Sequence, residues 1–168
     1  MRWIGAMIVF GCCGYFGFSM AISQKREERT LRQLIRAINY MECEIQYRMT
    51  PLPQLLGQAA GETTGVAGEV LLALSQELEN QISPDVSCCM GCVLNKQKDV
   101  PPASREVLRM LGQSLGRFDL QGQLKELDSV RILCERHLAE LDKDRDVRLR
   151  SYQTLGLCAG AALAILLL

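Results

Sequence analysis

The sequence predicts an all-α protein with a cytoplasmic bundle of about five to six helices, flanked by an N-terminal and a C-terminal transmembrane helix. Three observations support this prediction. Apolar residues recur at spacings of three and four through the middle of the 168-residue chain, and no alternating pattern of useful length accompanies them. Both ends of the chain are uncharged runs. Arg2 is the only charged residue outside residues 24–150, which hold 18 basic and 19 acidic side chains. We therefore expect transmembrane helices at 1–23 and 151–168 and a bundle domain at 24–150.

The N-terminal run has the length of a membrane span. Residues 3–22 are twenty residues without a charge, and twenty residues of α-helix are about 30 Å long, the thickness of the hydrocarbon core. Gly14 and Gly17 lie close to one face of that helix, where they allow a second helix to approach. Two alternatives are a signal peptide cleaved after Ser19-Met20-Ala21 and a lipoprotein signal ending at Cys12.

The C-terminal run is a shorter candidate span. Residues 152–168 are 17 residues, about 25 Å of helix, which is near the lower limit for crossing a bilayer. Gly156 and Gly160 form a G-x-x-x-G pair, which favours a helix–helix contact inside the membrane. The alternative is that small residues are simply common in short spans.

Basic residues on the inner sides of both runs favour two retained anchors. Lys25, Arg26, Arg29 and Arg32 follow the first run, whereas a cleaved signal would carry its positive charge mainly in front. The positive-inside rule then places the middle of the chain in the cytoplasm. We expect the four side chains to touch anionic lipid head groups, the alternative being that they only set the topology. Four further basic residues precede the second run: Lys143, Arg145, Arg148 and Arg150.

The helical pattern divides the middle of the chain into six segments. Glycine and proline mark most of the boundaries, and Gly116 is suited to a positive φ at the end of the fifth helix. Asp119 is placed to cap the sixth helix, which continues toward the C-terminal run. Thr50-Pro51 marks the start of the second helix, and Ser83-Pro84-Asp85 marks the start of the fourth. The expected helices cover 27–48, 50 to about 60, 63–81, 83 to about 95, 103–115 and 119–150.

The charge balance and the motifs point away from an enzyme and from a nucleic-acid-binding protein. Residues 24–150 have a net charge of −1, which excludes a polybasic nucleic-acid binder. The sequence contains no Walker motif and no G-x-G-x-x-G. His137 has charged neighbours in sequence, so we interpret it as part of a solvated face. No catalytic, cofactor-binding or metal-binding residue is predicted.

The strongest alternative is a membrane-anchored thiol or metal-binding protein that uses Cys88, Cys89 and Cys92. A zinc site needs a second cysteine pair or additional histidines, and the chain offers neither. A thioredoxin-like pair needs a strand before its helix, and no strand is expected there. We interpret the cluster as a short helix that uses cysteine as a small buried apolar residue.

The order of several short motifs resembles the stage III sporulation protein AB family. Arg32-Gln33-Leu34, Glu44-Ile45-x-Tyr47 and Thr50-Pro51-Leu52 follow the first apolar run. Leu111-Gly112-x-Ser114-Leu115-Gly116-x-x-Asp119-x-x-x-Gln123 looks like the signature of that family. The closing Leu155-Gly156 and Leu166-Leu167-Leu168 resemble its C-terminal span.

The resemblance implies a membrane protein of endospore-forming bacteria, in the mother-cell membrane facing the forespore. It implies a non-enzymatic platform within a secretion-like channel, with a soluble domain similar to that of the type II secretion platform protein, the F component. The implied partners are a secretion-type ATPase, other membrane proteins of the channel, the lipid bilayer and a second copy of the chain.

Two stretches are candidate partner contacts. One is the helix–turn–helix corner from Gly112 through Gly116 and Asp119 to Gln123, and the other is Glu44 and Tyr47 beside the Thr50-Pro51 turn. The alternative is purely structural, because the same residues suit a helix end, a helix cap and a fixed helix crossing.

Overall fold

A computed structural model describes residues 2–48, 50–80, 85–116 and 119–167, with side chains in 22–48, 50–80, 85–116 and 119–143. The described residues form α-helices and no strand, which confirms the all-helical prediction. The six helices are α1 (Arg2–Tyr47), α2 (Leu52–Gly61), α3 (Val66–Glu79), α4 (Val86–Lys96), α5 (Pro102–Ser114) and α6 (Leu120–Leu167).

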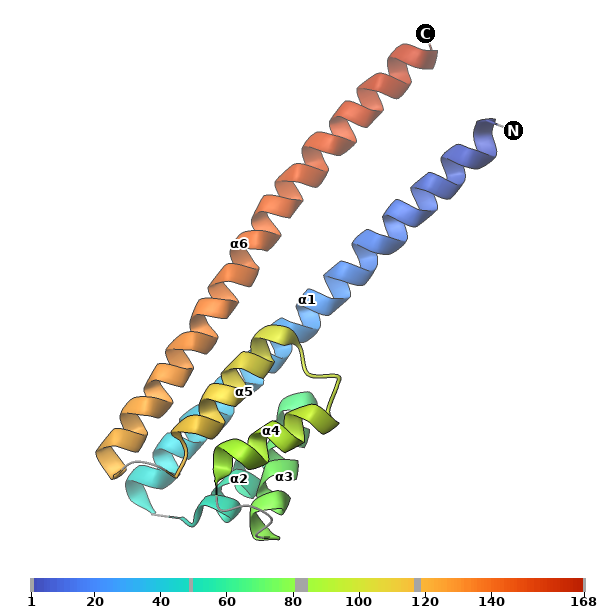
Figure 1. The fold of residues 1–168 in the computed structure, drawn as a ribbon. Helices are drawn as coiled ribbons and strands as arrows, with labels where there is room; N and C mark the ends of the chain where they lie inside the picture. Colours follow the sequence, from blue (N-terminus) through green and yellow to red (C-terminus); the bar gives the residue numbers. More distant parts are fainter. Residues whose placement is uncertain (1, 49, 81–84, 117–118, 168) are drawn as a thin grey trace.

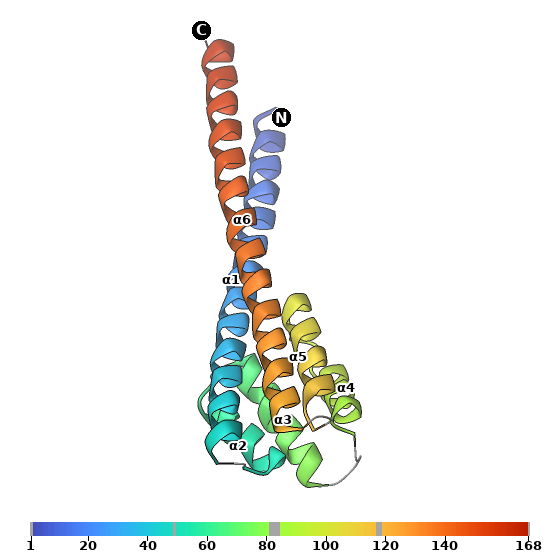
Figure 2. The same ribbon diagram turned by 90° about the vertical axis from the view of Figure 1, so that its left-hand side faces the viewer.

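The two long helices, α1 and α6, run antiparallel to each other and reach well beyond the rest of the molecule (Figure 1). Both chain ends therefore lie on the same side, as the view turned by 90° also shows (Figure 2). The four short helices pack around the other half of this pair. Neither long helix breaks between the bundle and its apolar run, so the backbone of each is one continuous helix.

Within the part of the chain with described side chains, no helix has both the length and the apolar character that a bilayer crossing requires. Residues 3–21 of the first expected span and all of the second, residues 152–168, lie outside that part, together with Gly14, Gly17, Gly156 and Gly160.

Local sequence signals set most of the helix ends. Asp85 caps α4 by accepting a hydrogen bond from the backbone N–H of Ser87 at 3.3 Å. Gly116 follows α5 with φ +77°, a conformation that glycine adopts without strain. The Oδ1 atom of Asp119 accepts from the Gly122 N–H at 3.1 Å, which confirms its role as the cap of α6.

Two predicted boundaries were wrong. Thr50 does not cap α2, because its hydroxyl donates to the Glu44 carboxylate at 3.2 Å and Pro51 takes the cap position. Helix α3 begins at Val66 rather than at residue 63, after Gly65 with φ +70°. The Thr63 hydroxyl instead bonds back to the last turn of α2, at 3.1 Å from the Ala59 carbonyl oxygen.

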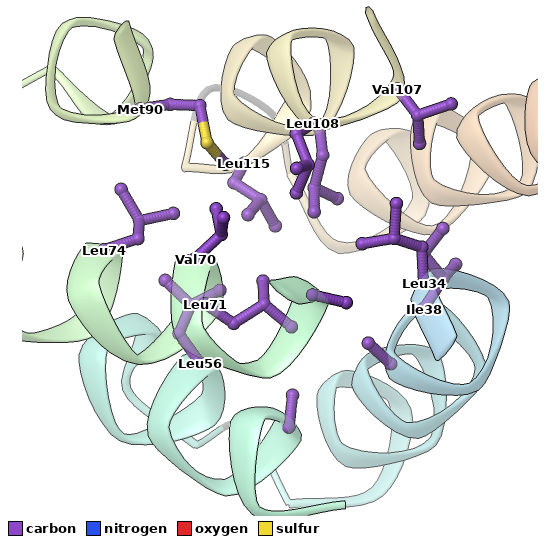
Figure 3. Close-up of a cluster of buried hydrophobic side chains, with 14 of the residues drawn as sticks. Leu34, Ile38, Leu56, Val70, Leu71, Leu74, Met90, Val107, Leu108 and Leu115 are labelled. Atoms are coloured by element: carbon purple, nitrogen blue, oxygen red, sulfur yellow. The ribbon is translucent and has the colours of Figure 1, made fainter. Parts of the chain in front are cut away.

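One hydrophobic core joins all six helices. Figure 3 shows side chains from α1 to α5 pointing into a shared interior, among them Leu34, Leu56, Leu71 and Leu108, each fully buried. Helix α6 completes the core with Leu127, Val130 and Cys134, all 0% exposed. The apolar stripe that the sequence predicts on the first helix is the face of α1 that enters this core.

Partly exposed charged side chains border the contact between α1 and α6. Glu42 on α1 lies near Arg131 and Asp128 on α6, and Arg131 donates a hydrogen bond to Asp128. Burial raises the pKa of the Glu42 carboxyl, while the nearby Arg131 guanidinium acts in the opposite direction. The Arg131–Asp128 pair lies within α6, and its side chains are 36% and 46% exposed, so Glu42 is the more buried charge of this group.

Two glycines on facing helices provide a matched test of the packing. A Cβ atom at Gly112 would lie 2.6 Å from Met90 Cβ, whereas a Cβ at Gly91 would meet nothing within 4 Å. Gly112→Ala should therefore destabilise the protein by about 1–3 kcal/mol through overpacking. Gly91→Ala should stabilise it by about 0.5–1 kcal/mol through helix propensity. Urea unfolding of the detergent-solubilised chain, followed by circular dichroism, measures both, and a Gly112→Ala variant as stable as the wild type would contradict this packing.

Candidate partner-docking site

A hollow of about 300 Å³ opens at the end of the bundle that is farthest from both chain ends. We call it the distal hollow. Its walls come from the end of α1, the start of α2 and the turn that leads into α6. The lining residues are Ile45, Thr50, Leu52, Leu55, Gly116, Leu120 and Gln123.

The antiparallel arrangement of α1 and α6 brings the two predicted contact regions together. Helix α1 ends at Tyr47 and α6 begins at Leu120, so residues some seventy positions apart in sequence meet at one end of the molecule. Gly116 and Gln123 from the predicted corner line the same hollow as Ile45 and Thr50. Residues 117–118 of that corner lie outside the described residues.

Glu44 organises the turn between α1 and α2. Its side chain is only 11% exposed and accepts a hydrogen bond from Thr50 Oγ1 at 3.2 Å. Arg48, one helical turn later, lies 3.4 Å from the same carboxylate. Glu44 thus holds the loop that forms one wall of the hollow, in agreement with the structural alternative for this residue.

Exposed apolar side chains lie at the distal end. Tyr47 is 79% exposed at the last position of α1, and Leu120 is 40% exposed at the first position of α6. Leu120 also lines the hollow, whereas Tyr47 lies outside its lining. Exposed apolar side chains at one end of a bundle offer area that a partner can cover.

The glycines of the predicted corner have different roles. A Cβ at Gly116 would lie 3.4 Å from Val86 and 3.6 Å from Leu52, so this glycine closes the turn beside the hollow. Gly112 is buried against Met90 in the contact between α4 and α5. It therefore belongs to the interior and offers no surface to a partner, which corrects its selection as a contact residue.

The basic residues predicted to face lipid lie on α1, toward the chain ends. Lys25, Arg26 and Arg29 are exposed, and the exposed Arg32 pairs with Glu28 at 2.8 Å. Between them, Glu27 accepts a hydrogen bond from the Ala103 backbone N–H at 2.7 Å. This contact fixes the start of α5 against α1, at the level of the basic residues.

The cysteine cluster is only partly buried, contrary to its interpretation as a set of small buried residues. Cys89 is 3% exposed and belongs to the core, but Cys88 and Cys92 are exposed one helical turn apart on α4. Among the described residues, no three histidine, cysteine, aspartate or glutamate side chains gather in a way that suits a metal ion.

His137 does not lie on a solvated face, so that prediction was wrong. Its side chain is 17% exposed and lies between two helices, with Nε2 3.5 Å from Glu106 of α5 and Nδ1 3.5 Å from Glu140 of α6. The sequence around His137 did not indicate this position, because its partner Glu106 on α5 lies 31 positions earlier in the chain.

Sequence reasoning missed the apolar lining of the hollow. Leu52, Leu55 and Leu120 sit in the first turns of α2 and α6, where they look like ordinary core positions. One signal could have identified Leu120. It is an apolar residue at the very first position of a long amphipathic helix, beyond the reach of the core.

Comparison with known proteins agrees with this architecture. The sequence model of the family described as "Stage III sporulation protein AB (spore_III_AB)" matches residues 2–168. The chain belongs to this family. Stage III sporulation protein AB of Bacillus subtilis (strain 168) is 26% identical to it over 171 residues, covering 100% of this chain and 99% of the relative.

A solved structure also matches this member of the stage III sporulation protein AB family. It is titled stage III sporulation protein AB (SpoIIIAB) and aligns with a TM-score of 0.63 at 24% identity. The match covers 73% of this chain and 98% of the solved one. The fold of the helical bundle is therefore shared with that protein.

Thiol labelling should distinguish the exposed from the buried cysteines. Burial raises the pKa of the Cys134 thiol to about 12, so almost none of it is the reactive thiolate near neutral pH. We expect N-ethylmaleimide at pH 7.5 to modify Cys43, Cys88 and Cys92 in the folded protein, and Cys134 only after unfolding. Peptide mass spectrometry reports each site. Modification of Cys134 in the folded protein as fast as that of Cys43 would contradict the described core.

Proposed function

We propose that this chain is a non-enzymatic, membrane-anchored platform component of a channel between mother cell and forespore, required for endospore formation. Its bundle docks a secretion-type ATPase in the cytoplasm. The observation that supports this proposal is the position of the distal hollow, at the opposite end of the molecule from the basic residues and the chain ends.

In this proposal the two apolar runs, residues 3–22 and 152–168, cross the mother-cell membrane that faces the forespore. The continuous backbones of α1 and α6 support this arrangement, because they direct both runs to the same side of the bundle. Gly14, Gly17, Gly156 and Gly160 are then available for contacts with other channel proteins or with a second copy of the chain.

The basic side chains set the orientation of the bundle. Lys25, Arg26, Arg29 and Arg32 follow the first run directly, which favours a cytoplasmic bundle under the positive-inside rule. Tyr47 is 25 residues beyond Ile22 on the same helix, which corresponds to about 38 Å along its axis. The distal hollow thus faces the cytoplasm, at a distance from the membrane where a large soluble partner has access.

The chemistry of the hollow suits a partner that inserts an apolar side chain. Apolar atoms from Leu52, Leu55 and Leu120 line it, and Tyr47, outside the lining, offers an exposed aromatic ring at the same end of the bundle. Aromatic side chains near the centre of a contact carry much of the binding free energy of protein complexes. The tightly packed core beneath supplies a rigid support, as a platform that transmits force requires.

A thiol or metal-binding function remains a second candidate, because Cys88 and Cys92 are exposed on one face of α4. Their spacing of four residues places their Cβ atoms about 5–6 Å apart. A triple variant, Cys88→Ser, Cys89→Ser and Cys92→Ser, separates the two functions. The platform proposal predicts normal spore counts for a stably folded triple variant, and the thiol function predicts their loss.

The docking proposal is tested with a double variant, Tyr47→Ala with Leu120→Ala, expressed as a tagged full-length chain in sporulating cells. Two truncated contact residues, at about 1–2 kcal/mol each, should reduce ATPase recovery from solubilised membranes more than tenfold. Ile132→Ala is the matched control, because Ile132 is 50% exposed on the same helix, away from the hollow. Equal ATPase recovery with the double variant and with the control would contradict docking at this end.

A further inference from the structure

We infer that the segment between α4 and α5, residues 97–101, is a second contact with anionic lipid head groups, made through Lys98. The bundle would then rest against the membrane surface at two points, α1 and this segment. The inference rests on the proposed membrane anchors and adds a lipid-binding surface to them.

The position of the segment follows from one long-range hydrogen bond. The Ala103 backbone N–H donates to Glu27 at 2.7 Å, so α5 begins beside residue 27 of α1. Residue 27 is five positions after Ile22, which is about 7–8 Å along the helix axis. The head-group layer on each side of a bilayer is about 5–8 Å thick. Figure 1 shows α5 and the preceding segment starting on the side of the bundle that faces the chain ends.

The segment is held firmly in this position. Arg105 donates to the Leu94 carbonyl at 2.9 Å and to the Gln97 carbonyl at 3.0 Å, which fixes the end of α4. Val100 is 5% exposed and packs into the core. The outward side chains are therefore Lys98 and Asp99, both exposed.

The charge at this end of the bundle suits an anionic surface. Residues 25–32 and 97–105 together have a net charge of +3, although 24–150 as a whole has −1. Glu27 and Glu28 are engaged with Ala103 and Arg32, whereas no described contact ties Lys25, Arg26, Arg29 or Lys98 to a carboxylate within the chain. A basic side chain near an anionic membrane contributes about 1 kcal/mol. Helix α1 thus presents a net positive charge at the depth where the segment exposes Lys98 beside Asp99. Arg105, the other cation of residues 97–105, is bonded to backbone carbonyls.

The test uses the full-length chain in lipid nanodiscs, either of phosphatidylcholine alone or of an equimolar mixture with phosphatidylglycerol. Hydrogen exchange measured by mass spectrometry follows the backbone amides of residues 97–100 and of Ala103, since Pro101 and Pro102 have no N–H. We expect exchange to be about fivefold slower in the anionic discs, because 1 kcal/mol corresponds to about that factor. High salt and Lys98→Glu should each abolish the difference. Lys125→Glu should leave it intact, since this exposed lysine lies in the second turn of α6, which begins at the other end of the bundle.

The outcomes separate this inference from the function on which it rests. A chain that does not insert into either disc would overturn the membrane anchors and this inference together. A chain that inserts, but whose residues 97–103 exchange equally in both discs, would overturn the lipid contact alone.

Discussion

The antiparallel contact between α1 and α6 determines most of the molecule. Leu31, Leu34 and Ile38 on α1 and Leu127 and Val130 on α6 are fully buried, so neither helix can leave the other without exposing core. Because the two helices run in opposite directions, one end of the pair carries both chain ends and the other carries the α1–α2 and α5–α6 turns. The four short helices pack beside this pair.

This geometry gives the molecule two different ends. One has basic side chains on α1 and on the segment before α5, and the other has the distal hollow, which Leu120 helps to line, and the exposed Tyr47. A chain built in this way connects a surface that attracts anions to a surface that accepts apolar groups, through a tightly packed bundle. Membership of the stage III sporulation protein AB family places that architecture in spore formation, and the proposed platform function assigns one partner to each end.

The sequence predicted a feature correctly where the feature depends on neighbouring residues. It failed where the feature depends on a side chain from another helix. Helix periodicity, Gly116 and the Asp119 cap concern neighbours within a few residues, and these features were predicted correctly. Thr50 and His137 were misjudged because each has a partner elsewhere, at Glu44 and Glu106 respectively. The distal hollow is a tertiary feature: the sequence suggested both of its walls, but not that they meet.

The central claim is that the bundle lies on the cytoplasmic side of the membrane, between two anchors. The exposed thiols of Cys43, Cys88 and Cys92 report this directly, because a membrane-impermeant maleimide labels only the side it can reach. We predict labelling in inverted membrane vesicles from sporulating cells and none in intact protoplasts, with labelling restored when the protoplasts are permeabilised. Labelling of these three cysteines in intact protoplasts would place the bundle outside the cytoplasm, where no ATPase could reach it, and would contradict the account.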